Sequence, residues 1–151
     1  MERKLQDKLP GGVFLDVPDR TRRTMKAVGG RGNKTTEWRL RAGLVRAGVA
    51  GFRMHVESLP GCPDFFFSEA LLVVFVDGCF WHGCPDCGHV PKTRSEFWRA
   101  KIDRNRERDQ RNDAMLGKTG IQVIRFWEHE LASDLGACVA RVASATSARF
   151  A

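Results

Sequence analysis

The sequence contains no long hydrophobic run and no internal repeat. No stretch approaches the roughly 20 apolar residues that a helix needs to span a bilayer. The first twelve residues, MERKLQDKLPGG, also lack the apolar segment of a signal peptide. We therefore expect a cytoplasmic protein with no membrane contact. In a reducing compartment its five cysteines are not expected to form disulfides.

Acidic residues are fewer than basic residues. The chain has 18 Asp and Glu residues against 25 Lys and Arg, which gives a net charge of +7 and a pI near 9.6. A basic surplus of this size favours a polyanionic partner, most often nucleic acid. The alternative is a soluble basic protein without such a partner. The length of 151 residues fits a single domain around one core.

Residues 1–34 lack a sustained hydrophobic pattern. Between Asp19 and Arg41, eight basic residues stand against two acidic ones. We therefore expect a basic arm over residues 1–34 that is loosely ordered without its polyanionic partner, followed by one folded domain over residues 35–151.

The hydrophobic pattern of the domain predicts a helix, three strands, a long helix, a strand and a last helix. The run LLVVFV is apolar on both faces, which is typical of a central strand. Thr35 or Thr36 is the expected cap of the first helix and Ser95 that of the long one. The expected bounds are 35–48, 52–57, 64–68, 71–76, 95–117, 121–127 and 130–147. This order predicts an α/β fold with one central mixed sheet flanked by helices.

Two aspartates mark the ends of neighbouring predicted strands. Asp64 begins one strand and Asp77 follows LLVVFV, so a hairpin would bring both to the same end of the sheet. Two carboxylates there suit Mg²⁺, which assists phosphodiester cleavage by neutralising charge and activating water. His82, just beyond Asp77, has a side chain suited to a general base. The alternative is that Asp64 simply faces solvent.

The long predicted helix carries two polar residues on its apolar stripe. The stripe consists of Trp98, Ile102, Asn105, Asp109 and Leu116. Asn105 and Asp109 are therefore expected to point toward protein, where an aspartate needs a cation or a hydrogen-bond donor. Alternatively, Asp109 pairs within its helix with Arg106 or Arg108. Glu37, at the start of the first helix, is a further acid that can converge on the same place.

Three cysteines, Cys79, Cys84 and Cys87, occur within nine residues. Clustered cysteines in a reducing compartment indicate metal binding, and a tetrahedral zinc site needs one further ligand. Either His89 or His129 can complete a Cys₃His set, which would be structural because it leaves no open position. The alternative is three unrelated thiols. The other two cysteines, at positions 62 and 138, are not expected to be ligands.

Six motifs occur in a fixed order between about Asp19 and Leu131: TRRTMKAV, TEWRLR, LPGCPDF, VFVDGCFWHGCP, PKTRSEFWRAKIDRNRERD and IRFWEHEL. Together they resemble the Vsr family of very-short-patch-repair DNA mismatch endonucleases. The resemblance implies a restriction-endonuclease-like single domain. It implies a Mg²⁺-dependent, strand-specific enzyme that nicks beside the T of T:G mismatches left by deamination of 5-methylcytosine. We accordingly expect a bacterial, nucleoid-associated monomer that binds double-stranded DNA and works alongside mismatch-repair proteins.

The resemblance also implies roles by position. Asp64 corresponds to the Mg²⁺-binding aspartate, His82 to the catalytic histidine, and Glu37 and Asp109 to acids around the metal. The implied zinc ligands are Cys79, Cys84, Cys87 and His129, which favours His129 over His89. Two features depart from the best-known members. Asp77 stands where those members have a histidine, and the segment after His82 is one residue shorter and supplies two cysteines.

Contacts with DNA are implied as well. Phe80 and Trp81 correspond to aromatics wedged into the base stack, and Met25 to an apolar residue that enters from the opposite groove. Unstacking costs roughly a few kcal/mol and less at a mismatch, and zinc would keep the wedge rigid. The alternative is that Phe80 and Trp81 belong to an ordinary core. The other expected DNA contacts are Arg20, Arg22, Arg23, Lys26, Lys92, Arg94 and Asn105.

Two rival functions stay open. One is a restriction or homing endonuclease of the same fold that cuts matched DNA. The other is a zinc-stabilised DNA-binding module with no chemistry, for which changing Asp64 would remove no activity.

Overall fold

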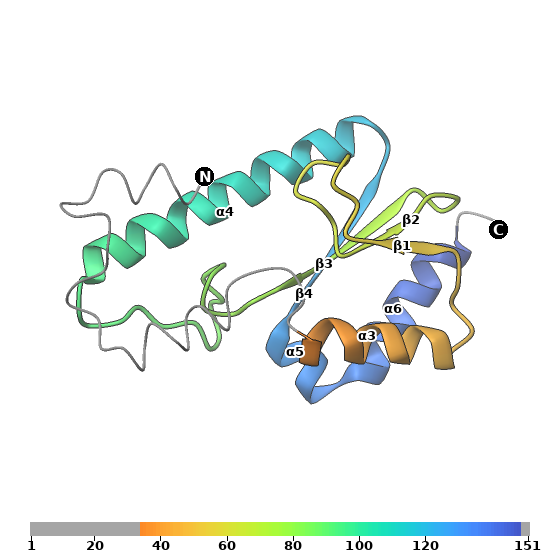
Figure 1. The fold of residues 1–151 in the computed structure, drawn as a ribbon, viewed down its shortest axis with the longest axis horizontal. Coiled ribbons are helices and arrows are strands. Elements are labelled where there is room, and N and C mark those ends of the chain that lie inside the picture. Colours follow the sequence, from red (N-terminus) through yellow and green to blue (C-terminus); the bar gives the residue numbers. More distant parts are fainter. Residues whose placement is uncertain (1–33, 149–151) are drawn as a thin grey trace. The chain divides into compact units, whose positions relative to one another are not determined.

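The fold is known from a computed structural model that describes residues 34–148 (Figure 1). The expected basic arm therefore lies outside the described residues. The same holds for five of the expected DNA contacts, Arg20, Arg22, Arg23, Met25 and Lys26.

The described elements form a mixed α/β arrangement, as the sequence predicts. In chain order they are α3 (Lys34–Arg46), β1 (Phe52–Met54), β2 (Phe65–Phe67), β3 (Leu72–Asp77), α4 (Ser95–Lys118), β4 (Gln122–Trp127), α5 (Glu128–Ser133) and α6 (Leu135–Ser147). The four strands form one sheet in the order β1-β2-β3-β4. The β1–β2 and β2–β3 pairs are antiparallel and the β3–β4 pair is parallel. A parallel pair needs a long crossover, which α4 provides.

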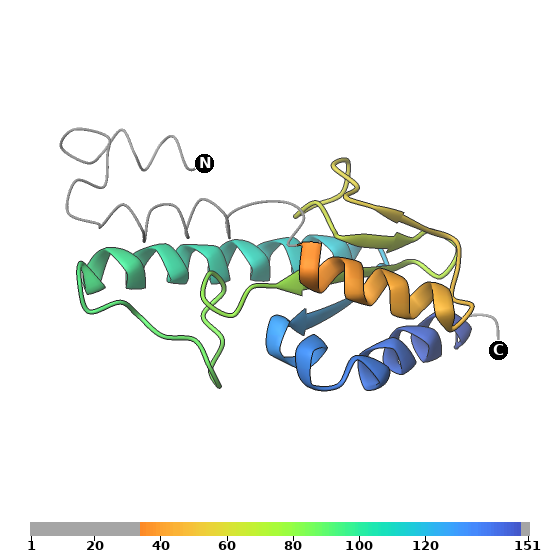
Figure 2. The same cartoon turned by 60° about the horizontal axis from the view of Figure 1, so that its bottom comes forward.

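Strand β3 is the centre of the sheet and contributes to a core on each face. On one face Leu72 and Val74 pack with Leu40 of α3 and Val142 of α6, and Figure 2 shows α3 and α6 side by side. On the opposite face Val73 and Phe75 pack with Leu116 near the end of α4 and with Ile121 just before β4. The alternating side chains of a strand explain the two cores, and burial on both faces confirms the expected central strand.

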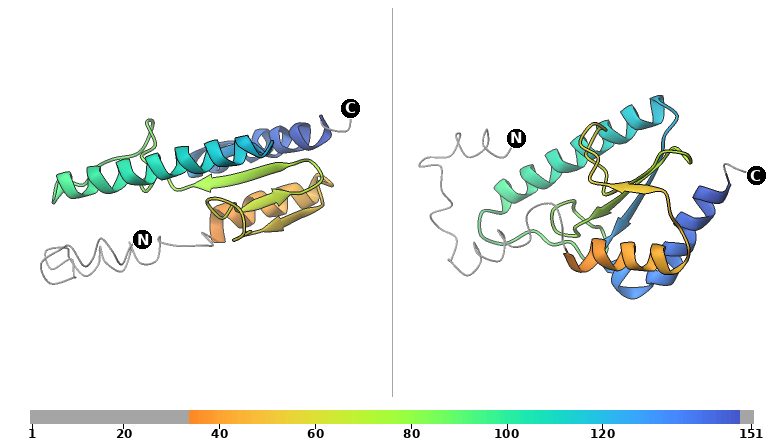
Figure 3. Two further views of the ribbon diagram at one scale, coloured as in Figure 1. Left: turned by 90° about the horizontal axis from the view of Figure 1, so that it is seen from above. Right: turned by 45° about the vertical axis from the view of Figure 1, so that its right-hand side comes forward.

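Helix α4 is much longer than the sheet it covers. Figures 1 and 3 show its N-terminal half extending beyond the strands, beside the segment that follows β3. In this half Trp98 and Ile102 are buried, whereas Leu116 near the other end packs on the sheet. The segment of residues 78–94 therefore has α4 as a base to pack on.

The expected C-terminal helix over 130–147 is wrong in one respect, because the structure has two helices there. Asp134 interrupts the run: its side chain accepts a hydrogen bond from Ala137 N at 3.0 Å and caps α6. An aspartate at this position offers the backbone an alternative to continued helix.

The expected caps and strand lengths also need correction. Helix α3 begins at Lys34, so neither Thr35 nor Thr36 precedes it. Arg94 occupies the cap position of α4 in a left-handed conformation, and Ser95 lies inside the helix. Strand β1 ends at Met54 because His55 has a φ of 51°, a left-handed conformation that interrupts regular pairing.

None of the helices within residues 34–148 has the length and apolar character needed to cross a membrane.

Candidate active site

The first group of titratable side chains lies where α3, β1 and β2 meet. It contains Glu37 in the first turn of α3, His55 just after β1 and Asp64 just before β2. His55 Nε2 lies 2.7 Å from Glu37 Oε2 and 3.8 Å from Asp64 Oδ1. The other Asp64 oxygen, Oδ2, accepts a hydrogen bond from the backbone N–H of Val76 at 2.7 Å. Glu37 and Asp64 thus converge as expected, whereas His55 was not anticipated.

The carboxyl group of Asp64 is poorly placed to carry a charge on its own. Burial has the largest effect, and together with the neighbouring carboxyl groups of Glu37 and Asp77 it raises the pKa of Asp64 from 3.8 to about 8. The hydrogen bond from Val76 opposes this rise only in part. A largely buried acid with a raised pKa is stabilised as a carboxylate by a cation, so the group has the chemistry of a cation site.

The second group contains Asp77 at the end of β3, His82 in the following turn and Asp109 in α4. His82 Nδ1 lies 2.5 Å from Asp109 Oδ2 and 3.9 Å from Asp77 Oδ1. Burial acts to raise the pKa of Asp109, but the hydrogen bond and charge of His82 outweigh it and leave that pKa below its ordinary value. Asp109 therefore keeps its charge and orients the imidazole.

The inward stripe of α4 has the expected geometry. Asp109 reaches His82, and Asn105 Nδ2 donates a hydrogen bond to the carbonyl oxygen of Trp81 at 2.9 Å. The alternative partner within the helix also contributes, since Arg108 Nη2 lies 3.6 Å from Asp109 Oδ1. Both polar residues thus join α4 to the turn that follows β3.

Arg125 in β4 is a member of the site that the sequence did not reveal. Its Nη1 donates to both carboxylate oxygens of Asp77 at 2.9 and 3.0 Å, and its Nε and Nη2 donate to Asp113 of α4. Its guanidinium also lies 4.1 Å from the centre of the Phe75 ring. Arg125 is the one charged residue in the predicted strand IQVIRFW, and this was the available signal, because an arginine drawn into a sheet needs an acidic partner.

Asp64 and Asp77 come out at the same end of the sheet, as the hairpin predicts. Phe65 pairs with Val74, which sets Asp64 close to the end of β3. Their carboxylates nevertheless join different groups, because Asp77 is bound by Arg125. Burial raises the pKa of Asp77, and the charges of His82 and Arg125 oppose the rise. Arg125 thus supplies a positive charge directly against Asp77.

The aromatic residues Phe80 and Trp81 pack against α4 and stay partly exposed. Their ring centres lie 5.4 and 6.0 Å from that of Trp98, and Lys101 Nζ lies 4.8 Å from the centre of the Trp81 ring. Gly83 allows this packing: its φ is 67°, and a Cβ there would lie 2.7 Å from Ile102. The turn holds both rings in place without burying them completely.

The two basic residues expected ahead of the long helix lie on the segment that leads into α4. Lys92 is exposed and Arg94 is half-buried at the cap position.

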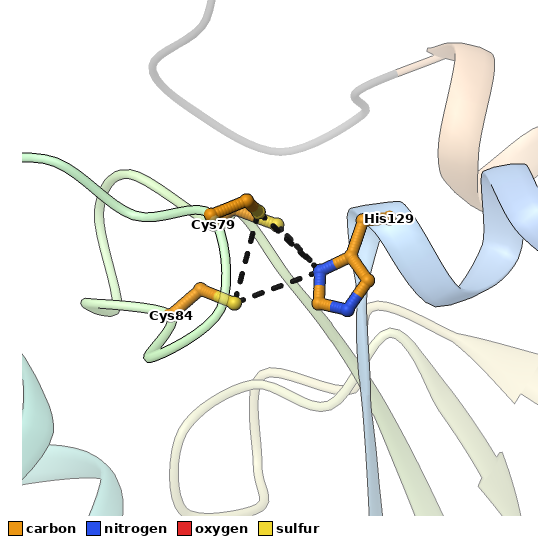
Figure 4. Close-up of side chains that lie close together, drawn as sticks. Cys79, Cys84 and His129 are labelled. Carbon is orange, nitrogen blue, oxygen red and sulfur yellow. Dashed lines mark hydrogen bonds between the residues drawn. The ribbon is translucent and has the colours of Figure 1, made fainter.

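Three cysteines from the turn after β3 lie beside a histidine from the first turn of α5. Figure 4 shows two of them, Cys79 and Cys84, facing His129. His129 Nδ1 lies 3.4, 3.5 and 3.4 Å from the sulfur atoms of Cys79, Cys84 and Cys87. The Cys84 and Cys87 sulfurs are 3.7 Å apart. Tetrahedral zinc with bonds of 2.3 Å to sulfur and 2.0–2.1 Å to nitrogen would separate sulfur pairs by about 3.8 Å and sulfur–nitrogen pairs by about 3.5 Å. The four side chains therefore fit a metal ion of this kind.

Electrostatics in this group also call for a cation. Contact with the Cys79 sulfur is the main reason why the pKa of Cys87 rises to about 12. Burial acts to raise the pKa of Cys84 as well, but hydrogen bonds from the backbone N–H groups of Cys87 and Asp86 lower it below its ordinary value. The Cys84 thiol thus loses its proton readily, whereas the Cys87 thiol does not. Neither Cys62, Cys138 nor His89 belongs to the group found among the described residues.

Comparison with known proteins gives a consistent picture. The model of the family DNA mismatch endonuclease Vsr matches residues 15–89. The type II nicking enzyme V.XorIIP of Xanthomonas oryzae pv. oryzae is 45% identical over 127 residues, which cover 83% of this chain and 90% of that protein. The DNA mismatch endonuclease Vsr of Escherichia coli K12 is 43% identical over 119 residues, covering 76% and 74%. The type II nicking enzyme V.NmeDIP of Neisseria meningitidis serogroup C is 33% identical over 131 residues, covering 85% and 87%.

These similarities define the class of protein as a DNA endonuclease, an enzyme that acts on phosphodiester bonds. More closely, the chain belongs to the Vsr family of DNA mismatch endonucleases. The resemblance found in the sequence motifs is thereby confirmed, and the similarity to nicking enzymes supports a DNA-nicking activity.

Proposed function

We propose that this protein is a Mg²⁺-dependent, strand-specific endonuclease that nicks DNA beside the T of T:G mismatches arising from deamination of 5-methylcytosine. The observation that carries the proposal is the pairing of two groups at one end of the sheet. Glu37, which is buried, and Asp64, which is largely buried, form an acidic group, and the oriented His82–Asp109 pair belongs to the group around Asp77 at the end of β3. The proposal includes a restriction-endonuclease-like fold, in which acidic residues at a strand end serve phosphodiester cleavage.

Asp64 and Glu37 are the residues that would hold the Mg²⁺ ion. Their buried, mutually repelling carboxyl groups suit a hard divalent cation. When bound, the ion neutralises charge on the phosphate and lowers the pKa of a water molecule.

His82 is the proposed general base. Because Asp109 accepts a hydrogen bond from Nδ1–H, the opposite nitrogen, Nε2, is the one left to take a proton from water. Asp77 lies 3.9 Å from His82 Nδ1 and is fixed by Arg125. In this role Asp77 supports a positive charge on His82 after proton transfer, and it does not need to bind metal.

Phe80 and Trp81 are the proposed wedge, and the Cys79, Cys84, Cys87 and His129 group is the proposed structural zinc site. Zinc would link the turn that carries the wedge to the start of α5. Because His82 lies in the same turn, a rigid turn would place the general base at the DNA backbone next to the distorted base step. Asn105 would assist by holding the carbonyl oxygen of Trp81.

The remaining DNA contacts belong to the proposed arm over residues 1–34 and to the segment before α4. Met25 would enter the opposite groove, and the basic residues Arg20, Arg22, Arg23, Lys26, Lys92 and Arg94 would bind phosphates. We further propose that the enzyme works as a monomer in the bacterial cytoplasm, on nucleoid DNA, with mismatch-repair proteins as partners.

The test is cleavage of T:G, T:A and C:G duplexes that share the same flanking sequence, with and without Mg²⁺. We expect a nick in the T strand of the T:G duplex only, and only with Mg²⁺. Asp64→Ala should abolish nicking and leave DNA binding measurable, since different residues bind the phosphates. Equal cutting of all three duplexes would favour a restriction-type enzyme. Binding without cleavage by the wild-type protein would favour a DNA-binding module without chemistry.

A further inference from the structure

His55 has no role in the proposed reaction, yet it has the position of a metal ligand. Its Nε2 atom faces two carboxylates from different elements, Glu37 Oε2 at 2.7 Å and Asp64 Oδ1 at 3.8 Å. The second oxygen of Asp64 is already used by the backbone N–H of Val76. The atoms that remain for a cation are therefore one oxygen from each acid and the imidazole nitrogen.

The spacing of these three atoms matches neighbouring ligands of one ion. In octahedral geometry with bonds of 2.0–2.1 Å, adjacent ligand atoms lie about 3 Å apart. The observed separations of 2.7 and 3.8 Å lie on either side of that distance. Small side-chain movements would bring all three atoms to a common ion.

Charge balance argues against His55 as a sufficient partner for the two acids. Glu37 is buried, with 6% of its surface exposed, and only 15% of the Asp64 side chain is exposed. If both acids were ionised, a single positive charge on His55 would match only one of them. A divalent cation bound to a neutral imidazole balances both acids.

We propose that His55 binds the divalent cation directly through Nε2, together with Asp64 and Glu37. This site of two carboxylates and one histidine takes Mn²⁺ more tightly, relative to Mg²⁺, than a site of oxygen ligands alone. The reason is that Mg²⁺ strongly prefers oxygen, whereas first-row transition metals also accept imidazole nitrogen. The assignment rests on the proposed function only in so far as Asp64 holds the catalytic cation.

The test is Mn²⁺ binding to the zinc-loaded, full-length protein without DNA. Pulsed electron paramagnetic resonance of bound Mn²⁺ should detect the coupling of an imidazole ¹⁴N nucleus. His55→Ala and His55→Asn should both lose that coupling and weaken Mn²⁺ binding at least about tenfold, with a smaller change for Mg²⁺. Asparagine is included because it tolerates the left-handed backbone at this position, and thermal unfolding verifies that each variant is folded.

Two histidine variants act as controls. His89→Ala, which changes an exposed histidine outside both groups, should keep the coupling. His82→Ala should keep it as well, because His82 belongs to the second group. Loss of the coupling in His82→Ala with its retention in the His55 variants would overturn the assignment. So would a wild-type protein that binds no Mn²⁺, or binds it without nitrogen coupling.

The outcomes also separate this assignment from the proposed function. If the protein shows the His55 coupling but nicks no T:G duplex, His55 remains a metal ligand and the proposed mismatch activity is rejected. If the protein nicks T:G DNA in an Asp64-dependent way but shows no nitrogen coupling, the proposed activity stands and His55 is rejected as a metal ligand.

Discussion

At the scale of single residues, Arg125 fixes the positions of two acidic neighbours, Asp77 and Asp113. Its guanidinium binds Asp77 and Asp113 together, so that three elements meet at one cation. Burial alone would lower its pKa, but the hydrogen bond with Asp113 and the charges of Asp77 and Asp109 raise it instead. Arg125 therefore stays charged, and Asp77 stays beside His82.

Replacing Arg125 with leucine should leave Asp77 as a buried acid without its main partner. We expect the free energy of unfolding to fall by roughly 2–4 kcal/mol, because breaking a buried ion pair leaves an uncompensated charge. Urea unfolding measures this change. Arg104→Leu on the exposed face of α4 is the matched control and should stay within about 0.5 kcal/mol of wild type. Equal stability of the two variants would mean that the Arg125–Asp77 pair contributes little.

Asp64 makes the stability of the protein depend on pH when Mg²⁺ is absent. Its pKa is about 8 in the folded protein against 3.8 for the ordinary group, so the folded state binds more protons between these values. The stabilising contribution is fully present below pH 4 and is lost as pH rises through about 8. In Mg²⁺-free buffer, with zinc retained, wild type should therefore lose stability from pH 5 to pH 8, on the order of a few kcal/mol more than Asp64→Asn.

Denaturant unfolding at several pH values measures this difference. Added Mg²⁺ at pH 8 should restore the stability of wild type and have little effect on Asp64→Asn. Parallel pH profiles for the two proteins would show that Asp64 is not the titrating group.

At the scale of elements, the fold depends on connections between distant segments. The Cys₃His group joins the turn after β3 to the first turn of α5, and Asn105 and Asp109 join the same turn to α4. The turn itself contains little regular structure, so these contacts keep Phe80, Trp81 and His82 in place.

Cys84→Ser should remove the metal and loosen this connection. We expect zinc content to fall from about one ion per chain and thermal stability to drop clearly, because a structural zinc ion contributes directly to folding. Elemental analysis and thermal unfolding provide the readouts. Cys62→Ser, which changes a cysteine outside the group, should keep the metal. Native protein without zinc would refute the site, and a fully loaded, equally stable Cys84→Ser variant would remove Cys84 from the ligand set.

At the scale of the whole molecule, the proposed recognition of a mismatch requires the proposed wedge and the proposed reaction centre to act together. Phe80→Ala should therefore reduce discrimination between T:G and T:A duplexes in addition to the nicking rate. A matched base pair resists unstacking more than a T:G wobble does, and Phe80 is the residue proposed to test this resistance. Nicking rates on the two duplexes at equal salt measure the ratio.

Phe97→Ala is a suitable comparison for Phe80→Ala, because Phe97 lies on the same helix as Trp98 but outside the proposed wedge. An unchanged T:G to T:A ratio in Phe80→Ala, together with a reduced rate, would assign Phe80 to packing of the turn and not to recognition.

The sequence by itself determined the order of most elements and the position of the central strand. It also indicated two features of the site, the inward-facing polar residues of α4 and the cysteine cluster. The continuous apolar run LLVVFV and the stripe of α4 are local patterns: the first indicates a strand buried on both faces, and the second fixes which side chains of the helix face inward. The spacing of Cys79, Cys84 and Cys87 is local too, and it already indicated a metal. The prediction of one long C-terminal helix was wrong. The residues on both sides of Asp134 favour helix, but Asp134 itself caps α6 and so divides the segment into two helices.

Only the tertiary structure decided which acids share a partner. His55 meets Glu37 across 18 residues of chain, and Arg125 meets Asp77 across 48. No periodicity connects such positions, because their contact follows from strand register and from the packing of α3 and α4 on opposite faces of the sheet. The same packing gives Asp64 and Asp77 different partners, although the sequence alone placed them together: Asp64 lies beside His55 and Glu37, whereas Asp77 is bound by Arg125 of β4 and lies beside His82.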